Sequence, residues 1–204
     1  MIQEAAVLAI AALLSAAAWQ DVKTREIDVR LFVAMTLPAA VLLYLNWGDP
    51  LYLLSLLAGL GVALLMRILC AGYADSIAMA VISTAPPIYI FPTAFVAIMA
   101  GSALLPAVMT WLYLKNRGRP CEMSLSERFT HLCVSRGEFY SDIKYIHKAA
   151  SFCIPFRNNP GDLERYDPRA VKIEGEWIKA AYGVPYLAIL ATGFAAYTAI
   201  TLGS

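Results

Sequence analysis

The chain has 204 residues, of which 60% are hydrophobic and only 15% are charged. Soluble domains usually carry about 25% charged residues. This composition, with a mean hydropathy of +0.62, excludes an ordinary soluble domain and indicates an integral membrane protein. The net charge of +1 argues against nucleic acid as a partner, because nucleic-acid-binding domains usually carry a basic stripe.

Six apolar runs approach the length of about 20 residues that a helix needs to cross a bilayer. They cover residues 2–19, 31–45, 51–71, 76–90, 93–114 and 181–202. The first run has only Glu4 near its start and no basic residue ahead of it, so we expect a retained span rather than a signal peptide. The second run contains Pro38 and the fourth is interrupted by Pro86-Pro87, which makes these two the shortest. The sequence therefore predicts an all-α polytopic membrane protein with six transmembrane helices.

The stretch 115–180 is rich in charged residues and predicts a small α+β insert between the fifth and sixth spans. Ser124 and Glu127 have the spacing of a capping box ahead of a short helix at about 125–135. A second helix is expected at 142–152, a turn at 157–162 and a strand at 171–173. The predicted organisation is five spans in 1–114, the insert in 115–180 and the sixth span in 181–204.

All sixteen Lys and Arg residues fall on one predicted side of the membrane. Six spans place the loops 20–30 and 67–75 and the insert together on that side. Because an excess of Lys and Arg marks the cytoplasm, we expect a multi-pass protein of the cell membrane with both ends outside. Cytoplasmic thiols stay reduced, so no disulfide is predicted among the four cysteines, Cys70, Cys121, Cys133 and Cys153.

Two aspartates lie at the edges of apolar runs on this same predicted face. Asp21 follows the first run and Asp75 precedes the fourth. A carboxylate costs roughly 2.5–3.5 kcal/mol at the centre of a membrane helix and less near the interface, so such residues usually have a function. Two carboxylates that share a proton can hydrolyse an amide, because one activates water as a base and the other donates to the carbonyl. The pattern therefore predicts a paired acid–base site.

A family resemblance rests on the residues around both aspartates. Asp21-Val-Lys-Thr-Arg-Glu-Ile27 directly follows the first span, and Gly72-Tyr-Ala-Asp75 lies between two later spans. This pattern resembles the membrane-embedded GxGD aspartyl proteases and, within them, the archaeal preflagellin peptidases, relatives of the type IV prepilin peptidases. The six-span layout and the insert also resemble this family, so the resemblance covers most of the chain.

The resemblance implies an aspartic endopeptidase that works in the bilayer without a cofactor. Asp21 and Asp75 would be its catalytic pair. The implied partners are preflagellin or prepilin-like membrane subunits, each with a short basic leader and an apolar helix. The enzyme would remove that leader at the cytoplasmic membrane face, with the active site toward the cytoplasm.

The chain departs from the family pattern at two positions. Ala74 stands where the family has glycine, which permits a tight backbone approach or a positive φ. Ile77 stands where the family commonly has lysine. These departures leave open a catalytically impaired peptidase-like binding or assembly factor. A proton-coupled transporter is a further alternative, because intramembrane acids also mark ion paths.

Purely structural roles for the same residues also remain open. Asp21 would then be an interfacial carboxylate paired with Lys23 or Arg25. Asp75 would be an N-cap, where the helix dipole favours its charged form and thus assigns the shared proton to Asp21. Lys23 and Arg25 mainly determine topology, with a second role in steering substrate or tuning Asp21.

Two further features complete the candidate site residues. Gly72 and Ala74 are predicted to shape the surroundings of the second aspartate. Four residues of the insert, Cys121, Cys133, His147 and Cys153, lack the paired spacing of structural zinc sites, so no metal is predicted.

Overall fold

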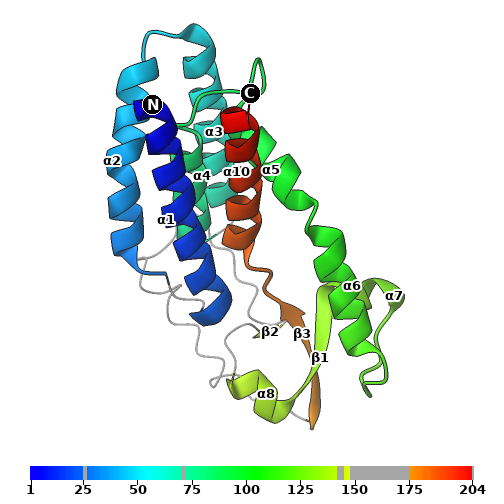
Figure 1. The fold of residues 1–204 in the computed structure, drawn as a ribbon. Coiled ribbons are helices and arrows are strands. Elements are labelled where there is room, and N and C mark those ends of the chain that lie inside the picture. Colours follow the sequence, from blue (N-terminus) through cyan, green and yellow to red (C-terminus); the bar gives the residue numbers. More distant parts are fainter. Residues whose placement is uncertain (25–26, 70–71, 142–144, 148–174, 204) are drawn as a thin grey trace. The chain divides into compact units, whose positions relative to one another are not determined.

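A computed structural model of the chain describes residues 1–24, 27–69, 72–141, 145–147 and 175–203 (Figure 1). The chain divides into two compact units. Unit 1 comprises Met1–Ala103 and Pro185–Ser204, and unit 2 comprises Leu104–Val184.

Unit 1 is a bundle of apolar helices. Its members are α1 (Ile2–Thr24), α2 (Val29–Asn46), α3 (Pro50–Ile68), α4 (Tyr73–Ile82), α5 (Thr93–Ser102) and α10 (Tyr186–Gly203). Helix α4 contacts all five of the others, so it is the central helix of the bundle. Its buried residues Met79 and Ile82 join one continuous apolar core with Leu14 of α1 and Phe194 of α10.

Within the described residues, five helical stretches are long and apolar enough to cross a membrane. They are α1, α2, α3, α10 and the stretch Thr93–Asn116. The prediction of six spans is therefore not confirmed, because α4 has only 10 residues. Helix α2 continues through Pro38, so this proline does not shorten the second span.

The turns that follow α4 explain how a short helix can occupy the centre of the bundle. Pro86 and Pro87 have no backbone N–H and cannot continue a helix. Carbonyl groups left in apolar surroundings without a hydrogen bond are costly. Here, side-chain hydroxyl groups of other helices donate to them at 2.6–2.9 Å: Tyr52 to Thr84, Thr93 to Ala85 and Pro86, and Tyr197 to Pro86.

Helices α5 and α10 touch through their backbones. A Cβ atom added to Gly193 would lie 1.8 Å from the carbonyl oxygen of Ala97, and one added to Gly101 would lie 2.2 Å from that of Ile189. Only glycine permits this approach, which is the usual role of small residues between membrane helices.

Unit 2 has α+β structure. It contains α6 (Leu105–Asn116), α7 (Leu125–Thr130), β1 (His131–Ser135), α8 (Arg136–Ser141), β2 (Tyr145–His147) and β3 (Trp177–Tyr182). The strands form an antiparallel sheet in the order β1-β3-β2. Its small core includes Leu112 of α6 and Phe139 of α8. The predicted fifth span is divided into α5 and α6 at Ala103 and Leu104, just before Pro106.

The local predictions for the insert have mixed outcomes. The capping box is confirmed, because the side chains of Ser124 and Glu127 each accept a hydrogen bond from the other's backbone N–H. Helix α7 ends at Thr130 rather than near 135, since strand β1 begins at His131. The helix expected at 142–152 is wrong at Tyr145–His147, where pairing with β3 overrides local propensity. The rest of that helix, the turn at 157–162 and the strand at 171–173 lie outside the described residues.

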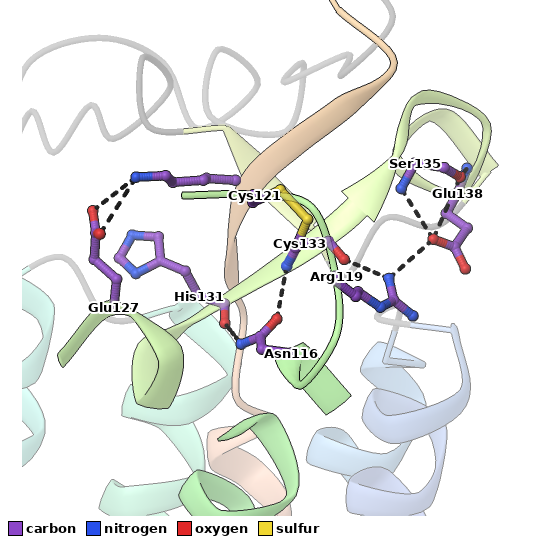
Figure 2. The surroundings of a disulfide bond; sticks show 9 residues. Asn116, Arg119, Cys121, Glu127, His131, Cys133, Ser135 and Glu138 are labelled. Carbon is purple, nitrogen blue, oxygen red and sulfur yellow. Dashed lines mark hydrogen bonds and ion pairs between the residues drawn. A yellow bond between two sulfur atoms is a disulfide. The ribbon is translucent and has the colours of Figure 1, made fainter. Parts of the chain in front are cut away.

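A disulfide joins Cys121 to Cys133, with Cα atoms 5.8 Å apart (Figure 2). The prediction of no disulfide is therefore wrong. It rested on the compartment alone, whereas the fold returns the segment after α6 to β1 and brings the two sulfur atoms together. Cys70 and Cys153 lie outside the described residues.

Candidate functional site

Asp21 is a buried carboxylate in the last turns of α1, with a relative exposure of 9%. It extends the buried face formed by Leu14, Ala17 and Ala18, because positions i, i+3, i+4 and i+7 share one side of a helix. Its side chain is thus directed toward the interior of the bundle rather than toward the surface. A charged residue in that position is unusual without a function.

Asp75 lies in the first turn of α4 and is partly buried. The N-cap of this helix is Gly72, so the interpretation of Asp75 as the N-cap is wrong; the residue stands three positions further on. Its carboxylate folds back toward the helix start, since a Cβ atom on Gly72 would lie 3.2 Å from Oδ2 of Asp75. Gly72 therefore leaves the space that this carboxylate occupies.

The two departures from the family pattern have different structural settings. Ala74 is helical and partly buried against the core, and its backbone does not have a positive φ. Glycine at this position is therefore not needed for backbone conformation. Ile77 is exposed to 44% on the outer side of the same helix.

Helix α1 ends and helix α4 begins at the same end of unit 1, because α1, α2, α3 and α4 follow one another with alternating direction (Figure 1). Asp21 lies in the last turns of α1 and Asp75 in the first turn of α4. Helices α1 and α4 also contact each other directly. Asp21 and Asp75 thus lie on two helices of one unit that contact each other.

Aromatic and basic residues surround this end of the bundle. The guanidinium of Arg67, at the end of α3, lies 3.6 Å from the ring centroid of Tyr73. Tyr186 begins α10, and the charge of Asp75 acts on its phenol. The ammonium of Lys23 lies 4.5 Å from the ring centroid of Trp19, a cation–π contact on the exposed side of α1. Arg25 lies outside the described residues.

Tyr186 and Tyr73 are neighbours of Asp75 that the sequence interpretation missed. A signal for Tyr186 was present, because tyrosine is enriched at membrane interfaces and this residue follows Pro185 at the start of an apolar run. Among the described residues, no group of three or more His, Cys, Asp or Glu side chains is arranged to hold a metal ion.

The helical bundle with two acids at one end defines the class of protein only coarsely: a multi-helix protein with five stretches suited to a membrane. Comparison of the chain with protein-family models, curated proteins and solved structures finds no match.

Proposed function

We propose that the chain is a membrane-embedded aspartyl endopeptidase that removes a short leader peptide from preflagellin or prepilin-like subunits. The observation that carries the proposal is a pair of carboxylates at one end of one helical bundle, on the adjoining helices α1 and α4. Asp21 is buried on the face of α1 that also carries Leu14, Ala17 and Ala18.

The two acids have different roles in this proposal. Asp75 stands in the first turn of α4, where the positive end of the helix dipole favours an ionised carboxylate. Asp21 would then hold the proton that the pair shares. Asp75 would therefore activate a water molecule as general base, while Asp21 would donate its proton to the carbonyl oxygen of the scissile peptide bond.

The position of the pair at a bundle end also suits the proposed substrate. A subunit with an apolar helix can keep this helix in the bilayer while its leader extends to the membrane face. The cleavage point, at the junction of leader and helix, would then reach acids that lie near the ends of their helices rather than in the middle.

The experiment uses the full chain, purified in detergent or lipid, with a preflagellin as substrate. We expect Asp21→Asn and Asp75→Asn each to abolish the shortened product while the helix content stays unchanged. Asp28→Asn is the matched control. Asp28 caps α2 by accepting a hydrogen bond from the N–H of Arg30, and asparagine caps equally well, so activity should persist.

Near-wild-type cleavage by either Asp21→Asn or Asp75→Asn would refute the acid–base mechanism. A wild-type chain that binds the subunit without shortening it would instead identify an assembly factor. The departure at Ala74 supports that alternative only weakly. Its backbone has ordinary helical angles, so this position does not require glycine.

A further inference from the structure

The disulfide of unit 2 lies at the junction between helix α6 and strand β1 (Figure 2). Cys133 is in the middle of β1, and Cys121 is in the segment that connects α6 to α7. The bond thus closes a loop that contains all of α7.

The two sulfur atoms differ in accessibility. Cys133 belongs to the central part of β1 and is completely buried, whereas Cys121 is partly exposed. Sγ of Cys133 is therefore closed to a thiolate from solution, so an attack on the bond has to occur at Sγ of Cys121. Access is one of the factors that determine the rate of thiol–disulfide exchange.

A second set of contacts holds the same junction without the disulfide. Asn116, the last residue of α6, is buried, and its amide nitrogen donates to the carbonyl groups of Arg128 and His131 at 3.0 and 2.7 Å. Its amide oxygen accepts from the backbone N–H of Cys133 at 2.9 Å. These three hydrogen bonds connect the end of α6 to β1 and to the end of α7.

Arg119 adds a further connection beside the disulfide. Its guanidinium donates to the carbonyl oxygen of Cys133 and lies 3.4 Å from the carboxylate of Glu138 (Figure 2). The contacts of Arg119 therefore hold the segment that carries Cys121 against β1. These contacts would keep the two thiols close together after the covalent bond is broken.

The distribution of Lys and Arg predicts that this part of the chain faces the cytoplasm, where low-molecular-weight and protein thiols reduce accessible disulfides. We propose that Cys121–Cys133 is a reversible thiol–disulfide exchange site, opened by a dithiol reductant and closed again without unfolding of unit 2. The polar clasp formed by Asn116 and Arg119 maintains the fold in both states. This proposal is independent of the proposed peptidase function.

The exchange is balanced with one dithiol. A thiolate of the reductant forms a bond to Sγ of Cys121, and the Cys121–Cys133 bond breaks with its electron pair on Sγ of Cys133, which takes a proton. The second thiol of the reductant then displaces Cys121 as a thiol. The reductant leaves as a disulfide, oxidised by two electrons, and both protein cysteines are reduced. The bond closes by the reverse exchange, in which a small-molecule or protein disulfide is the two-electron oxidant and leaves as a dithiol.

The test uses the full-length chain in detergent, with Cys70→Ser and Cys153→Ser so that only Cys121 and Cys133 can be labelled. The protein is equilibrated with mixtures of reduced and oxidised dithiothreitol and then labelled with a maleimide whose addition is counted by mass. We expect nearly complete double labelling at high dithiol, nearly none at low dithiol, and full return when the mixture is reversed. Hydrogen exchange of the β1 amide groups should stay slow throughout.

Two results would overturn the proposal: labelling at every mixture, which means that the bond does not form, or labelling only when β1 loses its protection from exchange. A variant that also carries Cys133→Ser tests accessibility. Its single thiol, Cys121, should label in the folded protein, and failure to do so would remove the entry point on which the exchange depends.

Discussion

Substitution of Gly72 by alanine should misplace the carboxylate of Asp75. The backbone at Gly72 has φ −55° and ψ 151°, which any residue can adopt. The only obstacle is therefore the new Cβ atom, which would lie 3.2 Å from Oδ2 and 3.8 Å from Cγ of Asp75. Ordinary contacts of this kind are 3.4–4 Å, so the carboxylate must move by a few tenths of an ångström.

This displacement gives the magnitude of the effect. A misplacement of about 1 Å at a catalytic group costs about 10²-fold in rate. We therefore expect kcat/KM for leader removal to fall about three- to tenfold, which corresponds to about 0.7–1.4 kcal/mol of activation free energy. The assay is the initial rate of formation of the shortened subunit by purified Gly72→Ala protein in lipid, compared with the unsubstituted chain.

Two control variants separate crowding from other effects. Gly72→Ser adds the same Cβ atom but is a better N-cap than alanine, so crowding predicts a similar loss of activity. Gly61→Ala, on α3, places its Cβ atom where no other atom lies within 4 Å and should keep full activity. Full activity in both Gly72 variants would refute the reasoning, and recovery in Gly72→Ser alone would assign the effect to helix capping.

Three further predictions concern packing and the insert. Gly193→Ala should lower the free energy of unfolding by about 3 kcal/mol, because its Cβ atom would overlap the carbonyl group of Ala97; unfolding in mixed micelles measures this. Asn116→Ala should cost about 3 kcal/mol by leaving buried polar groups of the β1 junction without partners, and faster hydrogen exchange in β1 would report it. The backbone N–H of Ser124 lowers the pKa of Glu127 to about 2, so this contact stabilises the fold above pH 4.5 and is lost as the pH falls toward 2. A titration midpoint above pH 4 for the Ser124 amide resonance would contradict this prediction.

The sequence was sufficient to predict the long apolar helices. Helices α1, α3 and α10 follow directly from runs of apolar residues, because a bilayer core admits few other structures. The capping box was equally predictable, since Ser124 and Glu127 are only three residues apart and each side chain accepts from the other's backbone N–H. These features share one property: their causes lie within a short stretch of chain.

The features that could not be predicted depend on contacts between distant residues. The length of α4 is one, because hydroxyl groups from α3, α5 and α10 stabilise the turns that replace its second half. The disulfide is another. Cys121 and Cys133 are separated by an entire helix, and only the return of the chain along β1 brings them together. Strand β2 likewise forms because β3 is available for pairing.

The contacts of the short central helix α4 explain how the candidate site is supported. Helix α4 ends at Ile82, roughly 10 Å along its axis from Asp75 at 1.5 Å per residue. Just beyond this end, the hydroxyl groups of Tyr52 and Tyr197 donate to the carbonyl groups of Thr84 and Pro86. Met79 and Ile82 are fully buried in this part of the helix. Because a helix is stiff along its axis, fixing its far end and its middle also restrains its first turn, which carries Asp75. A catalytic carboxylate needs such support, since its rate contribution depends on its position to within tenths of an ångström.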